Sequence, residues 1–199
     1  MTTHEHTASR IVLPILCTFL FITCNIFEPR EAEPPTQSGY QYQPRTFPAN
    51  VIFNLQNAIR EKDPVGYIAC FSDSTRNQAP YVFVPSADAA NLYGAVLRNW
   101  TYQQELSYFQ NLISKTRQPQ GFSFLSLTPK DSSGTTSRIY GFDYVLTFEH
   151  TDTAFTQTAR GSLQFTLTET NSEWTISRWV DLKTEPELTW SSFKGRFSN

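Results

Sequence analysis

The second half of the chain alternates apolar and polar side chains over long stretches, and this period of two constrains the fold more than any other feature. Apolar residues occupy every second position from Tyr140 to Phe148 without a break. Similar alternation predicts four strands, which begin near Phe122, Tyr140, Ala159 and Trp174. Turn-forming residues separate the strands, so we expect an antiparallel meander with one apolar face and one polar face.

Before this region, apolar residues recur at helical spacing. Start signals at residues 46–50 precede a first helix that ends at Asp63, and Pro64 begins a shorter second helix. A third helix is expected from Thr101 to Lys115, with a capped first turn. Three helices followed by a one-sided, curved antiparallel sheet predict an α+β domain.

Three segments carry weaker patterns. Residues 81–84 form a short strand candidate, and the apolar residues of 87–100 fit no single period. From about residue 184 the chain continues as a C-terminal tail to which the pattern assigns no element.

An uncharged apolar run lies near the start of the chain, from Ile11 to Cys24. It contains Pro14 and is shorter than the roughly 20 residues that a membrane-spanning helix needs. Such a run is typical of a signal peptide, so we expect residues 1–24 to direct export.

The end of this run, Leu20 to Cys24, resembles a bacterial lipobox, in which the cysteine is acylated and becomes the new N-terminus. We therefore expect a lipid on Cys24 to hold the protein on the membrane, because each buried methylene adds about 0.8 kcal/mol. By the same resemblance, Asn25 permits passage to an outer membrane, where the protein would face the periplasm or the exterior. Thr23 departs from the lipobox pattern, so an uncleaved anchor and another cleavage site are the alternatives.

Residues 25–45 are rich in proline, glutamine and charge and have no apolar periodicity. This composition is typical of a flexible tether, which leaves residues 46–199 as a single domain. The alternative is an irregular arm that lies on the domain through Tyr40 and Tyr42.

Composition and residue counts argue against several classes of function. The formal net charge is -2, and no basic stripe is visible, so nucleic acid is not an expected partner. Only His150 lies outside the leader, near a strand end, where we expect a solvated imidazole and no metal site. Cys70 sits among apolar residues and is expected to be a buried small side chain, with a nucleophile as the alternative. No cofactor motif is present, and we expect no cofactor.

The order of elements resembles the cone-shaped nuclear-transport-factor-2-like superfamily, also called SnoaL-like or ketosteroid-isomerase-like. The resemblance spans residues 46–183 and is carried by three segments of this sequence: the helix at 48–63, the second helix at 66–73 and the closing strand at 174–181. It implies helices packed on the concave face of the sheet. The tail at 188–197 resembles the ends of exported lipoproteins of no established activity.

Enzymes of this superfamily place a carboxylate or histidine base deep in the cone beside a tyrosine or a second acid, which implies that the cone interior is the place to search. The candidate pocket-lining residues here are Tyr140, Phe142, Tyr144, Trp174 and Arg178. Strict alternation points Arg178 inward, whereas a β-bulge would turn Arg178 outward and Trp179 inward.

Two carboxylates, Asp143 and Asp181, are candidate acid or base groups. Asp143 falls on the register opposite Tyr144, so we expect it on the polar face, with an Asp143 base and a Tyr144 donor as the alternative. Asp181 lies near the end of its strand, where we expect solvent around it. No catalytic residue is therefore assigned.

Three functions fit the sequence. The first is a membrane-anchored, non-catalytic domain that binds a partner protein or a small apolar ligand. The second is an isomerase, dehydratase or cyclase that acts on a hydrophobic molecule in the cone. The third is a structural subunit that forms a homodimer through the polar face of the sheet.

Overall fold

The computed structural model describes residues 42–76, 78–116, 121–133 and 137–198. The expected signal peptide, the acylated Cys24 and most of the expected tether lie outside these residues. Within the described ranges, no helix is both long enough and apolar enough to cross a bilayer.

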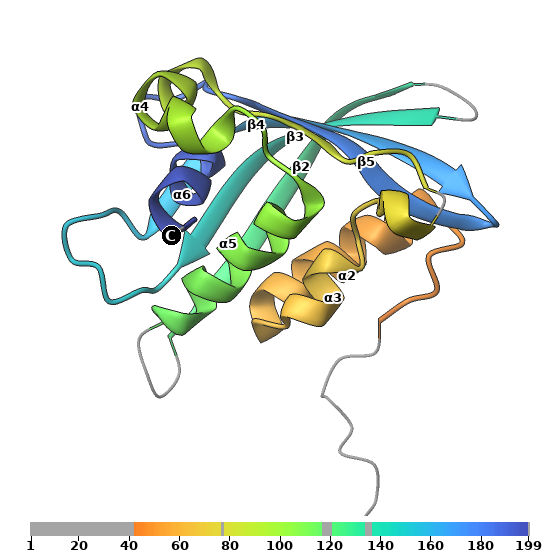
Figure 1. Cartoon of the computed structure of the whole chain (residues 1–199), viewed down its shortest axis with the longest axis horizontal. Coiled ribbons are helices and arrows are strands. Elements are labelled where there is room, and N and C mark those ends of the chain that lie inside the picture. The colour runs from red at the N-terminus through yellow and green to blue at the C-terminus, as the bar shows by residue number, and fades with distance from the viewer. Residues whose placement is uncertain (1–41, 77, 117–120, 134–136, 199) are drawn as a thin grey trace, which may run out of the picture. The chain divides into compact units, whose positions relative to one another are not determined.

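A five-stranded sheet forms one layer of the domain, with helices against one of its faces (Figure 1). Its strand order is β1-β5-β4-β3-β2. The strands are β1 (Val82–Val84), β2 (Ser123–Ser133), β3 (Ser137–Phe148), β4 (Thr158–Thr170) and β5 (Glu173–Leu182). The antiparallel meander of β2 to β5 is confirmed. However, β1 pairs with β5 in parallel, so the sheet is mixed and not purely antiparallel. Three residues are too few for their pattern to reveal the partner strand or its direction.

Within the described part of the chain, five α-helices accompany the sheet: α2 (Pro48–Glu61), α3 (Pro64–Ile68), α4 (Ala87–Leu97), α5 (Tyr102–Ser114) and α6 (Trp190–Phe197). The three expected helices correspond to α2, α3 and α5. Pro48 occupies the first turn of α2, where its missing N–H costs nothing. Thr101 caps α5 through a reciprocal pair of hydrogen bonds with Gln104, as its sequence predicts. The helices α4 and α6 were not predicted, and a non-helical residue, Tyr93, interrupts the period of α4.

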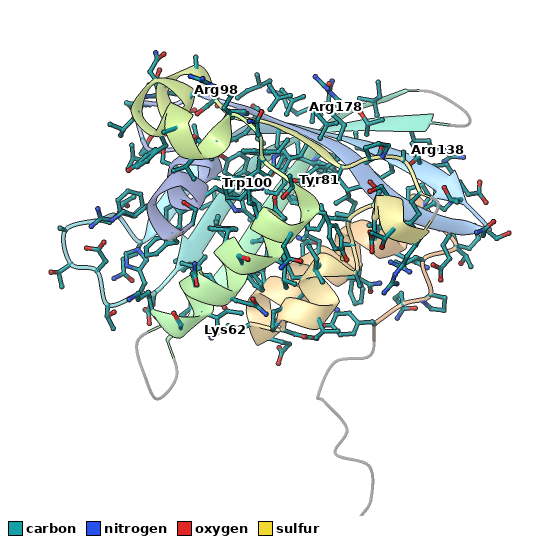
Figure 2. The ribbon with its side chains drawn as sticks, viewed as in Figure 1. Lys62, Tyr81, Arg98, Trp100, Arg138 and Arg178 are labelled. Carbon is teal, nitrogen blue, oxygen red and sulfur yellow. The ribbon has the colours of Figure 1, made fainter. Side chains whose placement is uncertain are left out.

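A β-bulge decides the direction of the side chains in β5. Thr166 pairs with Arg178 and Leu167 pairs with Ile176, so one extra residue intervenes on β5. Trp179 is therefore fully buried, and Arg178 is exposed on the face of the sheet away from α5 (Figure 2). Of the two orientations that the sequence allowed, the bulged one is present, so the assignment of Arg178 to the pocket-lining residues is wrong.

Residues 42–45 belong to the domain, although we expected them in the tether. The Tyr42 hydroxyl donates to Asp63 at 2.6 Å, and the backbone of Gln43 exchanges two hydrogen bonds with the Asn54 side chain. The Arg45 carbonyl accepts from the backbone N–H of Trp174 at 2.7 Å. The domain therefore begins no later than Tyr42.

Aromatic rings fill the space between the sheet and the helices. Trp179 lies at their centre, with its ring centroid 4.5 Å from that of Trp190, 5.2 Å from Phe165 and 5.4 Å from Phe83. All three pairs meet edge to face, which is a favoured geometry for aromatic contacts. The concave side of the sheet is thus packed with side chains around Trp179.

The bulge predicts opposite effects for two adjacent residues. Trp179→Ala should lower the free energy of unfolding by about 3–5 kcal/mol, because it leaves a cavity in the core. Arg178→Ala should change it by no more than about 0.5 kcal/mol, because the side chain is exposed. Urea unfolding of both variants measures this difference, and a large loss in Arg178→Ala would contradict the bulge.

Candidate functional site

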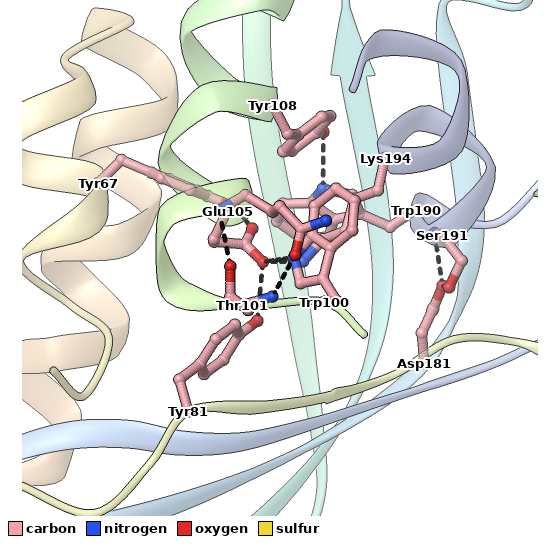
Figure 3. Close-up of polar contacts among 11 residues, drawn as sticks. Tyr67, Tyr81, Trp100, Thr101, Glu105, Tyr108, Asp181, Trp190, Ser191 and Lys194 are labelled. Carbon is pink, nitrogen blue, oxygen red and sulfur yellow. Dashed lines mark hydrogen bonds and ion pairs between the residues drawn. The ribbon is translucent and has the colours of Figure 1, made fainter. Parts of the chain in front are cut away.

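The most unusual group in the core is the carboxylate of Glu105, which is 0 % exposed. It lies in the first turn of α5 and accepts hydrogen bonds from three neutral side chains and from Lys194 (Figure 3). The Tyr67 hydroxyl donates to Oε1 at 2.6 Å, whereas the Tyr81 hydroxyl and Trp100 Nε1 donate to Oε2 at 2.8 and 2.7 Å. Burial raises the pKa of both tyrosines, so they remain protonated donors.

Lys194 of α6 pairs with this carboxylate and is also 0 % exposed. Its Nζ lies 2.5 Å from Glu105 Oε2, 3.6 Å from the ring centroid of Trp179 and 3.8 Å from that of Phe83. Burial lowers the pKa of Lys194 to about 8, and Glu105 opposes that shift. The Glu105 carboxylate and the aromatic faces stabilise the charged form of Lys194, against the effect of burial.

A second buried cluster holds the N-terminus of α6. The Tyr144 hydroxyl donates to Asp181 Oδ1 at 2.8 Å and accepts from the backbone N–H of Trp190 at 2.7 Å. The other oxygen of Asp181 accepts from the backbone N–H and the hydroxyl of Ser191. We expected Asp181 in solvent, but it is 1 % exposed, and burial raises its pKa. The expectation was wrong because the tail returns as α6 and covers the end of the strand.

These carboxylate–tyrosine pairs contain groups that an acid–base enzyme would use, but the groups are buried. Glu105, Lys194 and Asp181 are each no more than 1 % exposed; Lys194 donates to Glu105, and Tyr144 donates to Asp181. A substrate in the cone would have to displace α6 to reach them. Their geometry fits a role in stabilising the filled cone.

Asp143 lies where the sequence placed it, on the polar face. Its side chain is exposed and pairs with Lys130 at 3.1 Å and with the Ser162 hydroxyl. These two partners lower the pKa of Asp143. It does not bond to Tyr144, whose hydroxyl points to the other face and is held by Asp181.

One open groove of about 380 Å³ lies between α2 and the neighbouring strands β2 and β3. Ala49, Ile52 and Phe53 line it from the helix, and Tyr140 and Phe142 line it from β3. Gln56 and Lys130 add polar groups. We call this opening the α2 groove.

The structure separates the five candidate pocket residues. Tyr140 and Phe142 line the α2 groove, and their rings stack with centroids 6.4 Å apart. Tyr144 is buried beneath α6, and Trp174 is 5 % exposed, with the Arg138 guanidinium 5.7 Å from its ring centroid. Arg178 lies on the other face of the sheet.

His150 is buried, contrary to the expectation of a solvated imidazole. It is 0 % exposed, and its ring packs against Phe193 and Phe197 of α6. Its Nε2 lies 2.8 Å from the carbonyl oxygen of Thr156. The described residues contain no cluster of three or more side chains suited to hold a metal ion. Cys70 is buried as expected, and burial raises the pKa of its thiol to about 12.

Comparison with known proteins finds solved structures of similar fold. No family profile matches the sequence, and no curated protein matches it. Solved structures do match. A proposed aromatic-ring hydroxylase from Novosphingobium aromaticivorans has 12 % identity and a TM-score of 0.53, with 73 % of this chain and 92 % of that chain covered. A conserved protein from Planctomyces limnophilus has 12 % identity and a TM-score of 0.52, with 67 % and 91 % covered.

One further matching structure is described by the name of a superfamily. A nuclear-transport-factor-2-like protein from Shewanella oneidensis, of unknown function, has 11 % identity and a TM-score of 0.49 over 68 % of this chain and 95 % of that chain. The domain shares its α+β fold with the Novosphingobium and Planctomyces proteins, which match with TM-scores of 0.53 and 0.52. At these identities the likeness concerns the fold and no particular activity.

Sequence reasoning missed Glu105 and Lys194. The tail offered one signal, because Trp190, Phe193 and Phe197 recur at helical spacing and predict a helix with an apolar face. No local pattern could reveal that the lysine beside Phe193 points at Glu105, 89 positions earlier.

The buried ion pair predicts a strong coupling between its two residues. Lys194→Met should lower the free energy of unfolding by about 3–5 kcal/mol, because it leaves the Glu105 carboxylate buried without its cation. Adding Glu105→Gln should recover at least half of that loss, because a neutral amide replaces the unpaired charge. Urea unfolding of the two single variants and the double variant gives the coupling energy. Additive losses would show that the pair does not act as a unit.

Proposed function

We propose that this chain is an exported, lipid-anchored protein of the cell envelope whose domain binds a small apolar ligand in the α2 groove and catalyses no reaction. The observation that carries the proposal is the contrast between the two sides of α2. The cone interior is packed around Trp179 and Lys194, whereas the α2 groove is open and lined by apolar side chains.

The size of the groove favours a small molecule over a protein. Its volume of about 380 Å³ falls within the usual range of small-ligand sites, about 300–1,000 Å³. A stable protein interface needs about 800 Å² from each partner, which is more than this groove offers by itself. Gln56 and Lys130 at its margin would orient one polar end of the ligand.

The alternative of an isomerase, dehydratase or cyclase receives less support. It requires at least two polar groups that converge in an open pocket, whereas Glu105 and Asp181 are closed off with their tyrosine partners. The dimer through the polar face of the sheet stays a prediction. Phe122 and Phe124 of that face are exposed and stacked, and they would contribute to such a contact.

Filling the groove should weaken ligand binding. The neutral apolar fluorophore N-phenyl-1-naphthylamine serves as the probe. Ala49→Trp places a large ring in the groove from an exposed position in the first turn of α2, and it should weaken binding of the probe by at least about tenfold. Ala87→Trp is the matched control, because Ala87 is an exposed alanine in the first turn of α4.

The outcomes of this titration separate the alternatives. Unchanged binding in Ala87→Trp together with loss in Ala49→Trp supports the groove. Equal binding in both variants would place the probe elsewhere and overturn the proposal.

Anchoring through Cys24 predicts a second result. In cells fed an alkyne-labelled fatty acid, the full chain should take up the label and enter the detergent phase on phase separation. Cys24→Ser should abolish both, because the thiol that carries the lipid is gone. Cys17→Ser is the control and should keep both. Label that persists in Cys24→Ser would contradict the anchor.

A further inference from the structure

A second opening, of about 440 Å³, lies where the start of α5 faces the segment that follows α3. We call it the α5 pocket. Ser72 and Asp73 line it from the segment after α3, Tyr81 lines it from just before β1, and Trp100 and Tyr102 line it from the start of α5. It shares no lining residue with the α2 groove.

The α5 pocket contains a buried hydroxyl that has no partner. Ser72 is 0 % exposed, and within the described residues its Oγ makes no hydrogen bond. The backbone N–H of Ser72 is bonded to the Ile176 carbonyl, which holds the residue in place. A buried polar atom without a partner costs about 1–3 kcal/mol, so a bound molecule with a hydroxyl group would recover this loss.

The N-terminus of α5 adds hydrogen-bond donors to the same pocket. The first N–H groups of a helix have no acceptor within the helix. Thr101 caps the N–H of Gln104, but the helix itself supplies no acceptor for those of Tyr102 and Gln103. Both residues line the pocket.

A negative charge on the opposite wall decides which ligands fit. Asp73 accepts from the backbone N–H of Thr75 at 2.9 Å and from its hydroxyl at 2.7 Å, and these bonds lower the pKa of Asp73. The carboxylate is therefore ionised at neutral pH. A helix N-terminus alone would favour an anion, whereas Asp73 repels one, and the mostly exposed Arg76, whose Nε lies 3.6 Å from Asp73 Oδ2, offsets only part of that repulsion. A neutral molecule whose hydroxyls both donate and accept hydrogen bonds can bind the first N–H groups of α5 and the Asp73 carboxylate together.

Aromatic rings form the remaining wall. Tyr81 and Trp100 are held rigidly, because each donates a hydrogen bond to the same oxygen of Glu105 (Figure 3). Tyr102 beside them is only half-buried. Rigid apolar faces next to donors and an acceptor match a ring that has C–H faces and a rim of hydroxyl groups.

We propose that the α5 pocket binds a neutral sugar ring, with its hydroxyls on Asp73, Ser72 and the first N–H groups of α5 and its C–H face on the aromatic wall. This site is separate from the α2 groove and does not depend on the function proposed for that groove.

Isothermal titration of the purified full chain in detergent tests the site, with D-glucose, N-acetyl-D-glucosamine and glucose 6-phosphate as the probes. At least one of the two neutral sugars should bind and saturate, and glucose 6-phosphate should bind more weakly than glucose because Asp73 repels its phosphate. Tyr102→Ala should weaken binding of the neutral sugar by about tenfold. Asp73→Asn should reduce the preference for glucose over glucose 6-phosphate.

Phe53→Ala provides the control, because Phe53 is an exposed aromatic residue of the α2 groove. It should leave sugar binding unchanged while it weakens binding of N-phenyl-1-naphthylamine, and Tyr102→Ala should do the reverse. Failure of both neutral sugars to saturate the protein would overturn the proposal. Equal sugar affinity in Tyr102→Ala, or tighter binding of glucose 6-phosphate, would also overturn it.

Discussion

The ion pair between Glu105 and Lys194 is the interaction on which the rest of the structure depends. Two charges that are both 0 % exposed are costly to bury unless every polar atom finds a partner. Here the carboxylate is bonded to side chains from α3, from the segment before β1 and from the start of α5, and the ammonium comes from α6. One desolvated carboxylate therefore connects four parts of the chain that are distant in sequence.

This pair also bears on where we propose that ligands bind. Because α6 brings Lys194 and Trp190 into the cone, the interior is filled, and Asp181 secures the start of the same helix. The two proposed ligand sites therefore lie at the margins. The α2 groove has an apolar surface, and the α5 pocket has polar groups beside rings whose orientation Glu105 sets. The stabilising network and the α5 pocket thus share Tyr81 and Trp100.

Whether a feature could be predicted from the sequence depends on how far apart along the chain its interacting residues lie. The strands from Tyr140 to Leu182 and the capping box at Thr101 could be predicted, because side-chain alternation and helix caps depend on neighbouring residues. The burial of His150 and Asp181 could not, because both are covered by α6, which approaches from the far end of the chain. Of the candidate pocket residues, Tyr140 and Phe142 line an opening, and Tyr144 and Trp174 are buried. The bulge in β5, one of the two possibilities that the sequence left open for this strand, turns Arg178 outward.

The sequence by itself determined the elements: three of the five described helices, the antiparallel meander and its two unlike faces. These follow from local periodicity, which each segment carries within itself. Only the tertiary structure decided the direction of β1, the bulge that buries Trp179, and the pairing of Lys194 with Glu105. The physical reason is that the free energy of a buried charge or ring depends on what surrounds it, and those surroundings come from distant segments: Lys194 lies over the ring of Phe83, 111 positions earlier.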